Sequence, residues 1–128
     1  MKKTAILFSL MFLYVSCKKA NLDCHNFKIG KFRQNIEEFD LIVHSTRTKE
    51  GFQIDSTKLG VSKYQLIWKS DCVLESTLIE TSIETSKKHI GRKYYVNILK
   101  KISETEYIYS CKVDGIDFID QDTIIKIN

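Results

Sequence analysis

From residue 24 onwards, hydrophobic and polar residues alternate in short runs that are separated by glycine or polar turns. β-Branched and aromatic residues dominate these runs, as is typical of antiparallel strands. The clearest run covers residues 62–69, where Tyr64, Leu66 and Trp68 share one side and polar residues share the other, with Ile67 as the exception. This spacing predicts a strand with one buried face.

The same alternation predicts strands along most of the remaining chain. Residues 39–56 form a predicted hairpin with its turn at 48–51, and Phe39, Leu41 and Val43 are expected on its buried face. The other predicted strands are 26–33, 73–81, 93–102, 106–113, 116–119 and 123–127, with tight turns at 70–72 and 114–115.

One segment fits two patterns, because Leu74, Leu78, Ile79 and Ile83 are also spaced as a helical stripe. The β-branched, serine and threonine residues of 76–86 have low helix propensity, so we expect a strand to residue 81 and a loop after it. Seven or eight strands without a crossover helix predict an all-β fold. We expect a single antiparallel meander that follows an N-terminal signal helix and forms a curled sheet or a small lipocalin-like barrel.

Residues 1–16 have the pattern of a signal peptide. Two lysines precede an uncharged run over 4–15, which is shorter than the roughly 20 residues of a membrane-spanning helix. Ser16 and Cys17 resemble the lipobox of bacterial lipoproteins, in which the cysteine becomes an acylated N-terminus; ordinary signal cleavage is the alternative. The predicted organisation is a signal peptide at 1–16, a tether at 17–23 anchored to the membrane by lipid on Cys17, and one β domain at 24–128.

The charge of the chain does not indicate a nucleic-acid partner. Removal of Lys2 and Lys3 with the signal leaves 18 basic against 16 acidic side chains, a net charge of +2. Phosphate binding needs a clustered basic face. The one basic cluster, at 87–93, is interpreted as a solvated loop, with contact to an anionic lipid or polyanion as the alternative.

Four cysteines are present, and export permits disulfides. Lipid on Cys17 leaves Cys24, Cys72 and Cys111, an odd number. Cys24 and Cys72 both lie at the ends of predicted elements, where a bridge breaks no strand pairing, so we predict a Cys24–Cys72 disulfide. Cys111 alternates with tyrosines on a predicted inward face and is expected to be a small buried residue.

A metal site is not predicted. Asp23, Cys24 and His25 are adjacent, and Cys72 and His44 offer further ligands, but this spacing is not that of a zinc module. Neighbouring residues on an extended chain point to opposite sides, so Cys24 and His25 would not converge on one ion.

Catalytic residues and cofactor motifs are equally lacking in the sequence. Cys72 with His44 or His89 has no local signature of a nucleophilic pair. The paired carboxylates at 37–38 and 120–122 are interpreted as solvated turns rather than glycosidase acids. GxGxxG, GxxxxGK[ST], GxSxG and HExxH motifs do not occur, so neither an enzyme nor a cofactor is predicted.

Two stretches resemble small uncharacterised envelope lipoproteins of Bacteroidetes: C-x-x-F-K-x-G-K-F at 24–32 and I-W-K-S-D-C at 67–72. Proteins of this type are sometimes labelled as a DNA topoisomerase IV subunit, which an exported domain of this size has no room to be. The resemblance implies an outer-membrane lipoprotein. Because the acidic residues that promote surface display are missing directly after Cys17, it also implies that the domain faces the periplasm.

The G-K-F opening and the antiparallel meander also resemble lipocalin-like exported domains, which implies a barrel that can enclose a cavity. The aromatic residues that would line such a cavity or form plain core are Tyr64, Trp68, Tyr94, Tyr107 and Tyr109. Two functions follow as expectations. The first is a non-enzymatic structural or interaction module with an envelope protein as partner; the alternative is a lipocalin-like carrier of a small apolar ligand.

Overall fold

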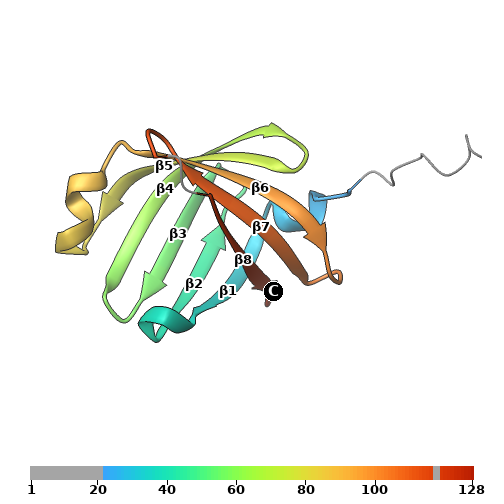
Figure 1. Cartoon of the computed structure of the whole chain (residues 1–128), viewed down its shortest axis with the longest axis horizontal. Coiled ribbons are helices and arrows are strands. Elements are labelled where there is room, and N and C mark those ends of the chain that lie inside the picture. Colours follow the sequence, from blue (N-terminus) through green and yellow to red (C-terminus); the bar gives the residue numbers. More distant parts are fainter. Residues whose placement is uncertain (1–21, 117–118) are drawn as a thin grey trace, which may run out of the picture.

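The computed structural model describes residues 22–116 and 119–128, so the predicted signal peptide and Cys17 lie outside the described residues. Eight antiparallel strands follow one another around a closed meander barrel (Figure 1). The all-β fold and the antiparallel meander were predicted from the sequence, and the barrel was one of two predicted forms, the other being a curled sheet. The strands are β1 (Gly30–Ile36), β2 (Leu41–Arg47), β3 (Phe52–Thr57), β4 (Gly60–Ser70), β5 (Val73–Thr81), β6 (Lys93–Lys101), β7 (Glu106–Val113) and β8 (Ile119–Lys126).

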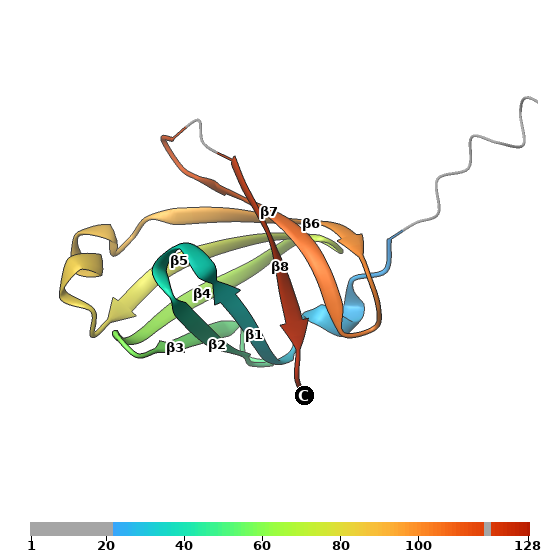
Figure 2. The same cartoon turned by 60° about the horizontal axis from the view of Figure 1, so that its bottom comes forward.

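Within the residues that the structure describes, three short 3₁₀ helices lie at the two ends of the barrel. η2 (His25–Phe27) precedes β1 at the end that also carries the β2–β3, β4–β5 and β6–β7 turns, which we call the closed end. η3 (Glu37–Phe39) and η4 (Glu84–His89) lie at the opposite end, which we call the open end. Figures 1 and 2 show η2 on one side of the barrel and the other two helices on the far side.

The hydrophobic core occupies the closed end. Phe27 of η2, Phe32 of β1 and Tyr107 of β7 are completely buried, and the rings of Phe27 and Tyr107 lie 4.3 Å apart. Trp68 is partly buried against this cluster. The closed end is therefore filled by side chains, and η2 acts as its plug. The buried cluster consists of Cys24, Phe27, Phe32, Ile98, Tyr107 and Ile124.

Arg47 holds the plug in place. Its side chain is 5 % exposed, and it donates hydrogen bonds to the carbonyl oxygen of Phe27 at 2.7 Å and to Oε1 of Gln53 at 2.9 Å. The guanidinium carbon lies 4.6 Å from the ring centre of Phe32. A buried cation needs hydrogen-bond acceptors and gains from an aromatic face. Arg47 thus ties η2 to β2 and β3 across the barrel end.

The seam between β1 and β8 is much shorter than the other pairings. β1 pairs with β8 only at Phe32 with Lys126 and at Arg33 with Ile125. By contrast, the β7–β8 and β1–β2 ladders each extend over seven residue pairs. The barrel wall is therefore closed near the closed end, while β1 and β8 diverge towards the open end.

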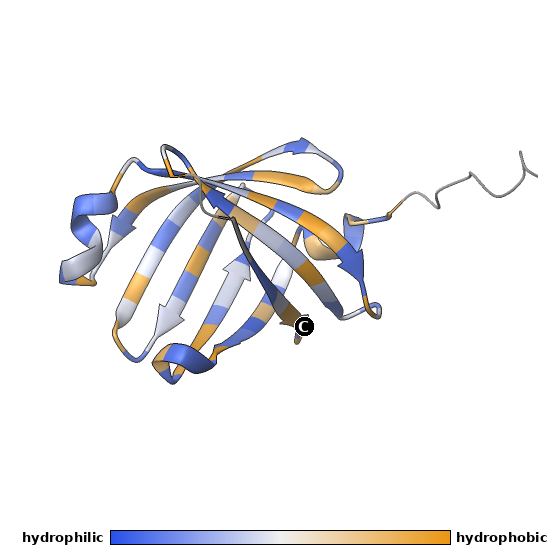
Figure 3. Cartoon of the chain, in the orientation of Figure 1, coloured by the Kyte–Doolittle hydropathy of each residue, from blue (hydrophilic) through white to orange (hydrophobic). Residues whose placement is uncertain are grey.

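The alternation along the strands matches the prediction, and Figure 3 shows it as alternating bands of hydropathy. The strand boundaries differ in several places. Phe39 lies in η3 and is 70 % exposed, because Asp40 takes a left-handed conformation (φ 48°) that turns the chain before β2 begins. Residues 84–89 form η4 instead of a loop. The predicted strands 116–119 and 123–127 belong to one strand, β8, which pairs continuously with β7; residues 117–118 lie outside the described part.

The start of the first strand also shifts, from residue 26 to Gly30. Gly30 has φ 135°, and a Cβ atom there would lie 2.7 Å from the carbonyl oxygen of Asn128. Glycine permits both this conformation and this close approach. The chain therefore leaves η2 and enters β1 through a bend that other residues would strain.

We predict that Phe27→Ala lowers the free energy of unfolding by about 3–5 kcal/mol, because it removes a fully buried ring from the plug. Chemical denaturation followed by circular dichroism measures this change. The control is Ile29→Ala, whose side chain is 53 % exposed and whose replacement should cost less than about 0.5 kcal/mol. Equal effects of the two substitutions would contradict the role of Phe27 as a plug.

Candidate functional site

A cavity of about 510 Å³ lies inside the barrel and reaches from the core cluster to the open end. All eight strands contribute to its wall because every second residue of each strand points inwards. Phe39, Ile83 and Ser86 from the open-end connections lie around its mouth. The deeper wall includes Gln34, Val43, Ser45, Arg47, Gln53, Asp55, Tyr64, Leu74, Ser76, Tyr94, Val96, Tyr109, Cys111, Asp122 and Ile124.

The five aromatic residues singled out from the sequence differ in depth. Tyr64 and Tyr94 line the cavity, Trp68 and Tyr107 pack in or against the core cluster at the closed end, and Tyr109 does both. The rings of Tyr64 and Tyr94 meet edge to face, with their centres 6.1 Å apart. Burial is the main factor that raises the pKa of Tyr64, Tyr94 and Tyr109 above the usual value for tyrosine.

One side of the cavity is a polar network on β2 and β3. The carboxylate Oδ1 of Asp55 accepts hydrogen bonds from Ser45 Oγ at 2.6 Å and from Gln53 Nε2 at 2.9 Å. Gln53 in turn accepts a hydrogen bond from Arg47. Burial raises the pKa of the Asp55 carboxyl, and this effect exceeds the lowering by the two hydrogen bonds and by the charge of Arg47.

A second network lies on β1, β7 and β8. Gln34 Nε2 donates to the hydroxyl oxygen of Tyr109 and to Asp122 Oδ2, the latter at 2.8 Å. The other carboxylate oxygen of Asp122 accepts the backbone N–H of Thr123 at 2.7 Å. Asp122 was interpreted from the sequence as part of a solvated turn, and that interpretation is wrong. It lies on β8, half-buried on the cavity side, because the predicted turn is absent from the β7–β8 ladder.

A lateral cleft of about 790 Å³ opens where β1 and β8 diverge. The cleft and the internal cavity share Ile36, Glu38, Phe39 and Asp122, so they adjoin at the open end. Acidic side chains outnumber basic ones around the cleft: Glu37, Glu38, Glu106 and Asp122 are present with Arg33.

The sequence analysis did not single out the polar residues of the cavity wall. On β3, the inward residues are Gln53, Asp55 and Thr57, while Phe52 and Ile54 face away from the barrel interior. The alternation of polar and hydrophobic residues was visible in the sequence, but the polar residues were expected to face solvent rather than the barrel interior. Cys111 was expected to be buried; it is half-buried, because the barrel at its level encloses the cavity rather than packed side chains.

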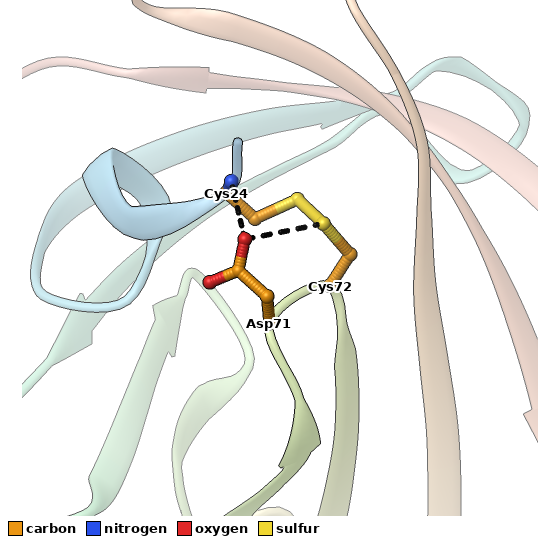
Figure 4. A group of neighbouring side chains, drawn as sticks. All are labelled: Cys24, Asp71 and Cys72. Atoms are coloured by element: carbon orange, nitrogen blue, oxygen red, sulfur yellow. Dashed lines mark hydrogen bonds between the residues drawn. A yellow bond between two sulfur atoms is a disulfide. The ribbon is translucent and has the colours of Figure 1, made fainter. Parts of the chain in front are cut away.

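The predicted disulfide joins Cys24 to Cys72, with their Cα atoms 5.4 Å apart (Figure 4). Asp71 Oδ2 accepts the backbone N–H of Cys24 at 3.2 Å, and Asp71 Oδ1 lies 3.1 Å from Nζ of Lys28. This hydrogen bond and the neighbouring Lys28 hold the pKa of Asp71 below its usual value. The bridge therefore fastens the start of η2 to the β4–β5 turn.

Cys24, Asp71 and Cys72 are also the one set of metal-ligand types that gathers within the described residues. Metal binding by cysteine requires a thiolate, and both sulfur atoms are consumed by the disulfide. The contact of 3.9 Å between Asp71 and the sulfur of Cys72 in Figure 4 has no proton to share. His25 and His44, weighed with these cysteines in the sequence, do not belong to the set.

Comparison of the chain with protein-family models, with curated proteins and with solved structures found no match. Across residues 22–116 and 119–128, no helix has the length and hydrophobicity needed to cross a membrane. The cavity and its two networks are therefore the observations from which a function is argued.

We predict that Asp55→Asn raises the melting temperature of the ligand-free protein by a few degrees at pH 7. Because burial raises the Asp55 pKa, this residue stabilises the fold fully only below the pKa of the unfolded chain, and that stabilisation is lost as pH rises through the folded pKa. The gain from Asp55→Asn should therefore shrink as pH falls.

Thermal unfolding followed by circular dichroism between neutral and mildly acidic pH measures this dependence. Glu80→Gln removes the same charge from an exposed position and serves as the control. A gain from Asp55→Asn that is the same at every pH, or a loss that is greatest at neutral pH, would contradict the stated environment of Asp55.

Proposed function

We propose that this protein is a non-enzymatic envelope lipoprotein that holds a small amphipathic molecule inside its barrel. The observation that carries the proposal is the cavity of about 510 Å³ with one open end. Ligand sites in proteins typically have volumes of roughly 300–1,000 Å³ and combine apolar walls with a few polar groups. The carrier function, which was the alternative in the sequence analysis, is thereby favoured over a purely structural role.

The chemistry of the wall supports an amphipathic ligand rather than a purely apolar one. Val43, Leu74 and Val96 supply apolar surface, while tyrosine hydroxyls, serines and two carboxyl groups supply hydrogen-bonding sites. A purely apolar ligand would cover these polar groups without pairing them, which costs free energy. A ligand with both a hydrocarbon part and a polar head satisfies both kinds of surface.

Binding is also favoured over catalysis by the composition of the wall. Among the described residues, its lining includes no histidine, the most frequent general acid–base residue. Burial raises the pKa of Tyr64 and Tyr109, which makes them poorer general bases, and Asp122 already accepts two hydrogen bonds. These groups are suited to donating to and accepting from a bound molecule.

The proposed location is the outer membrane, with the lipid on Cys17 as anchor and the domain facing the periplasm. In support, the Cys24–Cys72 disulfide is compatible with an oxidising envelope compartment. A carrier fixed in this way would exchange its ligand without leaving the membrane surface.

A second candidate function is binding of a protein partner along the β1–β8 seam. Only two residue pairs join these strands, and a cleft lies beside them. Backbone groups on diverging strands can accept an added strand from a partner. Hydrogen exchange would distinguish the candidates, since a partner strand should protect amides of 120–124 whereas a ligand should protect cavity-facing elements all around the barrel.

We predict that the mature protein binds the neutral fluorescent probe Prodan in the cavity and that Val96→Phe weakens this binding by about tenfold or more, equivalent to about 1.4 kcal/mol. The added ring would occupy space that Val96 leaves open. Asn97→Phe, on the adjacent exposed position of β6, is the matched control and should leave the probe affinity unchanged. Fluorescence titration would refute the proposal if wild type fails to bind or if the two variants behave alike.

We predict that Cys17 is acylated, because the uncharged run ends at Ser16 directly before it. Metabolic labelling with a fatty-acid analogue should mark the wild-type protein, and Cys17→Ala should abolish the label and release the protein from the membrane fraction. Label that persists in Cys17→Ala, or an unlabelled wild type, would show that the anchor is wrong.

A further inference from the structure

We infer that the cavity selects ligands whose polar head is a protonated amine, with the Asp55 carboxylate as its partner. The inference rests on the proposed function and assigns a chemical class to the ligand. It follows from the hydrogen bonds of Asp55, from the position of Arg47 and from the aromatic and acidic groups around the cavity.

Asp55 has one carboxylate oxygen left for a ligand. Ser45 and Gln53 both donate to Oδ1, at 2.6 and 2.9 Å. Oδ2 accepts no hydrogen bond from residues 22–116 or 119–128, although Asp55 lines the cavity. A carboxylate removed from bulk water needs a donor on each oxygen, and a cationic donor is the strongest. Asp55 Oδ2 therefore lacks a hydrogen-bond donor, and an ammonium group of a ligand would supply one.

Arg47 is the only basic residue of the cavity wall, and it does not pair with Asp55. Its guanidinium donates to the Phe27 carbonyl and to Gln53 and stacks on Phe32. No ion pair connects it to Asp55 within the described part of the chain. Arg47 acts on Asp55 only through its charge, without a hydrogen bond or ion pair between them, and so leaves Asp55 Oδ2 open to a ligand.

An aromatic ring lies close to this carboxylate. Asp55 pairs with Ser62 across the β3–β4 ladder, and Tyr64 follows two residues later on the same inward side of β4, close enough for the Asp55 charge to act on the tyrosine hydroxyl. Tyr94 extends the aromatic wall on β6, with its ring edge to face with that of Tyr64. Aromatic faces attract ammonium groups, particularly where water is excluded. A carboxylate close to Tyr64 therefore favours an amine over a neutral or anionic head.

The other charged residues around the cavity and the cleft also favour a cationic ligand. The cavity wall contains Glu38, Asp55 and Asp122 against Arg47, and the adjoining cleft adds Glu37 and Glu106 against Arg33. Clefts lined mainly by one sign of charge concentrate ligands of the opposite sign. The openings of the barrel thus attract cations before Asp55 binds them.

The test is competition against Prodan on the mature full chain at neutral pH, with decylammonium, decanol and decanoate as competitors. The three share one hydrocarbon chain and differ only in the head. We expect decylammonium to displace the probe at a concentration about tenfold lower than decanol, since hydrogen bonds to charged groups are the stronger ones. Decanoate should be the weakest competitor.

The variant Asp55→Asn tests whether Asp55 causes the preference for decylammonium over decanol. Asparagine keeps an oxygen that can accept from Ser45 and Gln53 but removes the charge. We expect the affinity for decylammonium to fall about tenfold relative to that for decanol, so that the two competitors become equivalent in the variant. Glu80→Gln, which removes one exposed charge outside the cavity, should leave all three competitors unchanged.

The outcomes separate this inference from the proposed function. If Prodan does not bind wild type, the proposed carrier function itself fails. If Prodan binds but decylammonium competes no better than decanol, the carrier function is supported and the inferred selectivity for amines is wrong. Stronger competition by decanoate would overturn the inference in favour of an anionic head at Arg47. The wild-type series decides these points even if Asp55→Asn does not fold.

Discussion

The architecture depends on the hydrogen bond from Arg47 to the carbonyl of Phe27, because this contact holds a short 3₁₀ helix across one end of the barrel. A 3₁₀ turn of three residues has little stability of its own. Here it gains stability from the buried ring of Phe27, from the aromatic stacking of Arg47 and from the Cys24–Cys72 disulfide. With that end sealed, exchange with solvent takes place at the open end and along the diverging β1–β8 seam.

The sealed end also explains why the interior is divided along the barrel axis. Large buried side chains gather around the plug, whereas the inward positions nearer the open end include tyrosines, serines, glutamines and acids together with valines such as Val43 and Val113. A barrel of eight strands is just wide enough either to be filled by its side chains or to hold one small ligand. Hydrophobic packing provides stability at the closed end, and polar lining preserves a cavity in the remainder.

Period-two alternation was sufficient to predict the fold class, the β2–β3 hairpin and the β4–β5 turn with its disulfide. These features depend on residues that are close in sequence or at element ends. Which aromatic residues are core and which line the cavity was not predictable, because Tyr107 and Tyr109 share one face of β7 and differ only in depth. Depth is set by the tilt and stagger of strands in the closed barrel.

The polar networks could not be predicted for a related reason. Asp55 appears beside hydrophobic residues on a short strand, and its inward orientation follows from its pairing with Ser45 on β2 and Ser62 on β4. Likewise, the exposure of Phe39 follows from the left-handed turn at Asp40 and not from the alternation pattern. Neither the cross-strand pairing of Asp55 nor the turn at Asp40 is visible in the alternation along a single strand.

The most direct test of the central claim is a nuclear magnetic resonance titration of the isotope-labelled mature protein with Prodan. If the barrel interior is the ligand site, amide signals of the cavity wall, such as those of Asp55, Tyr64 and Val96, should shift in a saturable way. Signals of outward residues such as Ile67 and Ile79, and of the plug, should remain in place. Shifts confined to the outer face of the barrel would contradict the account.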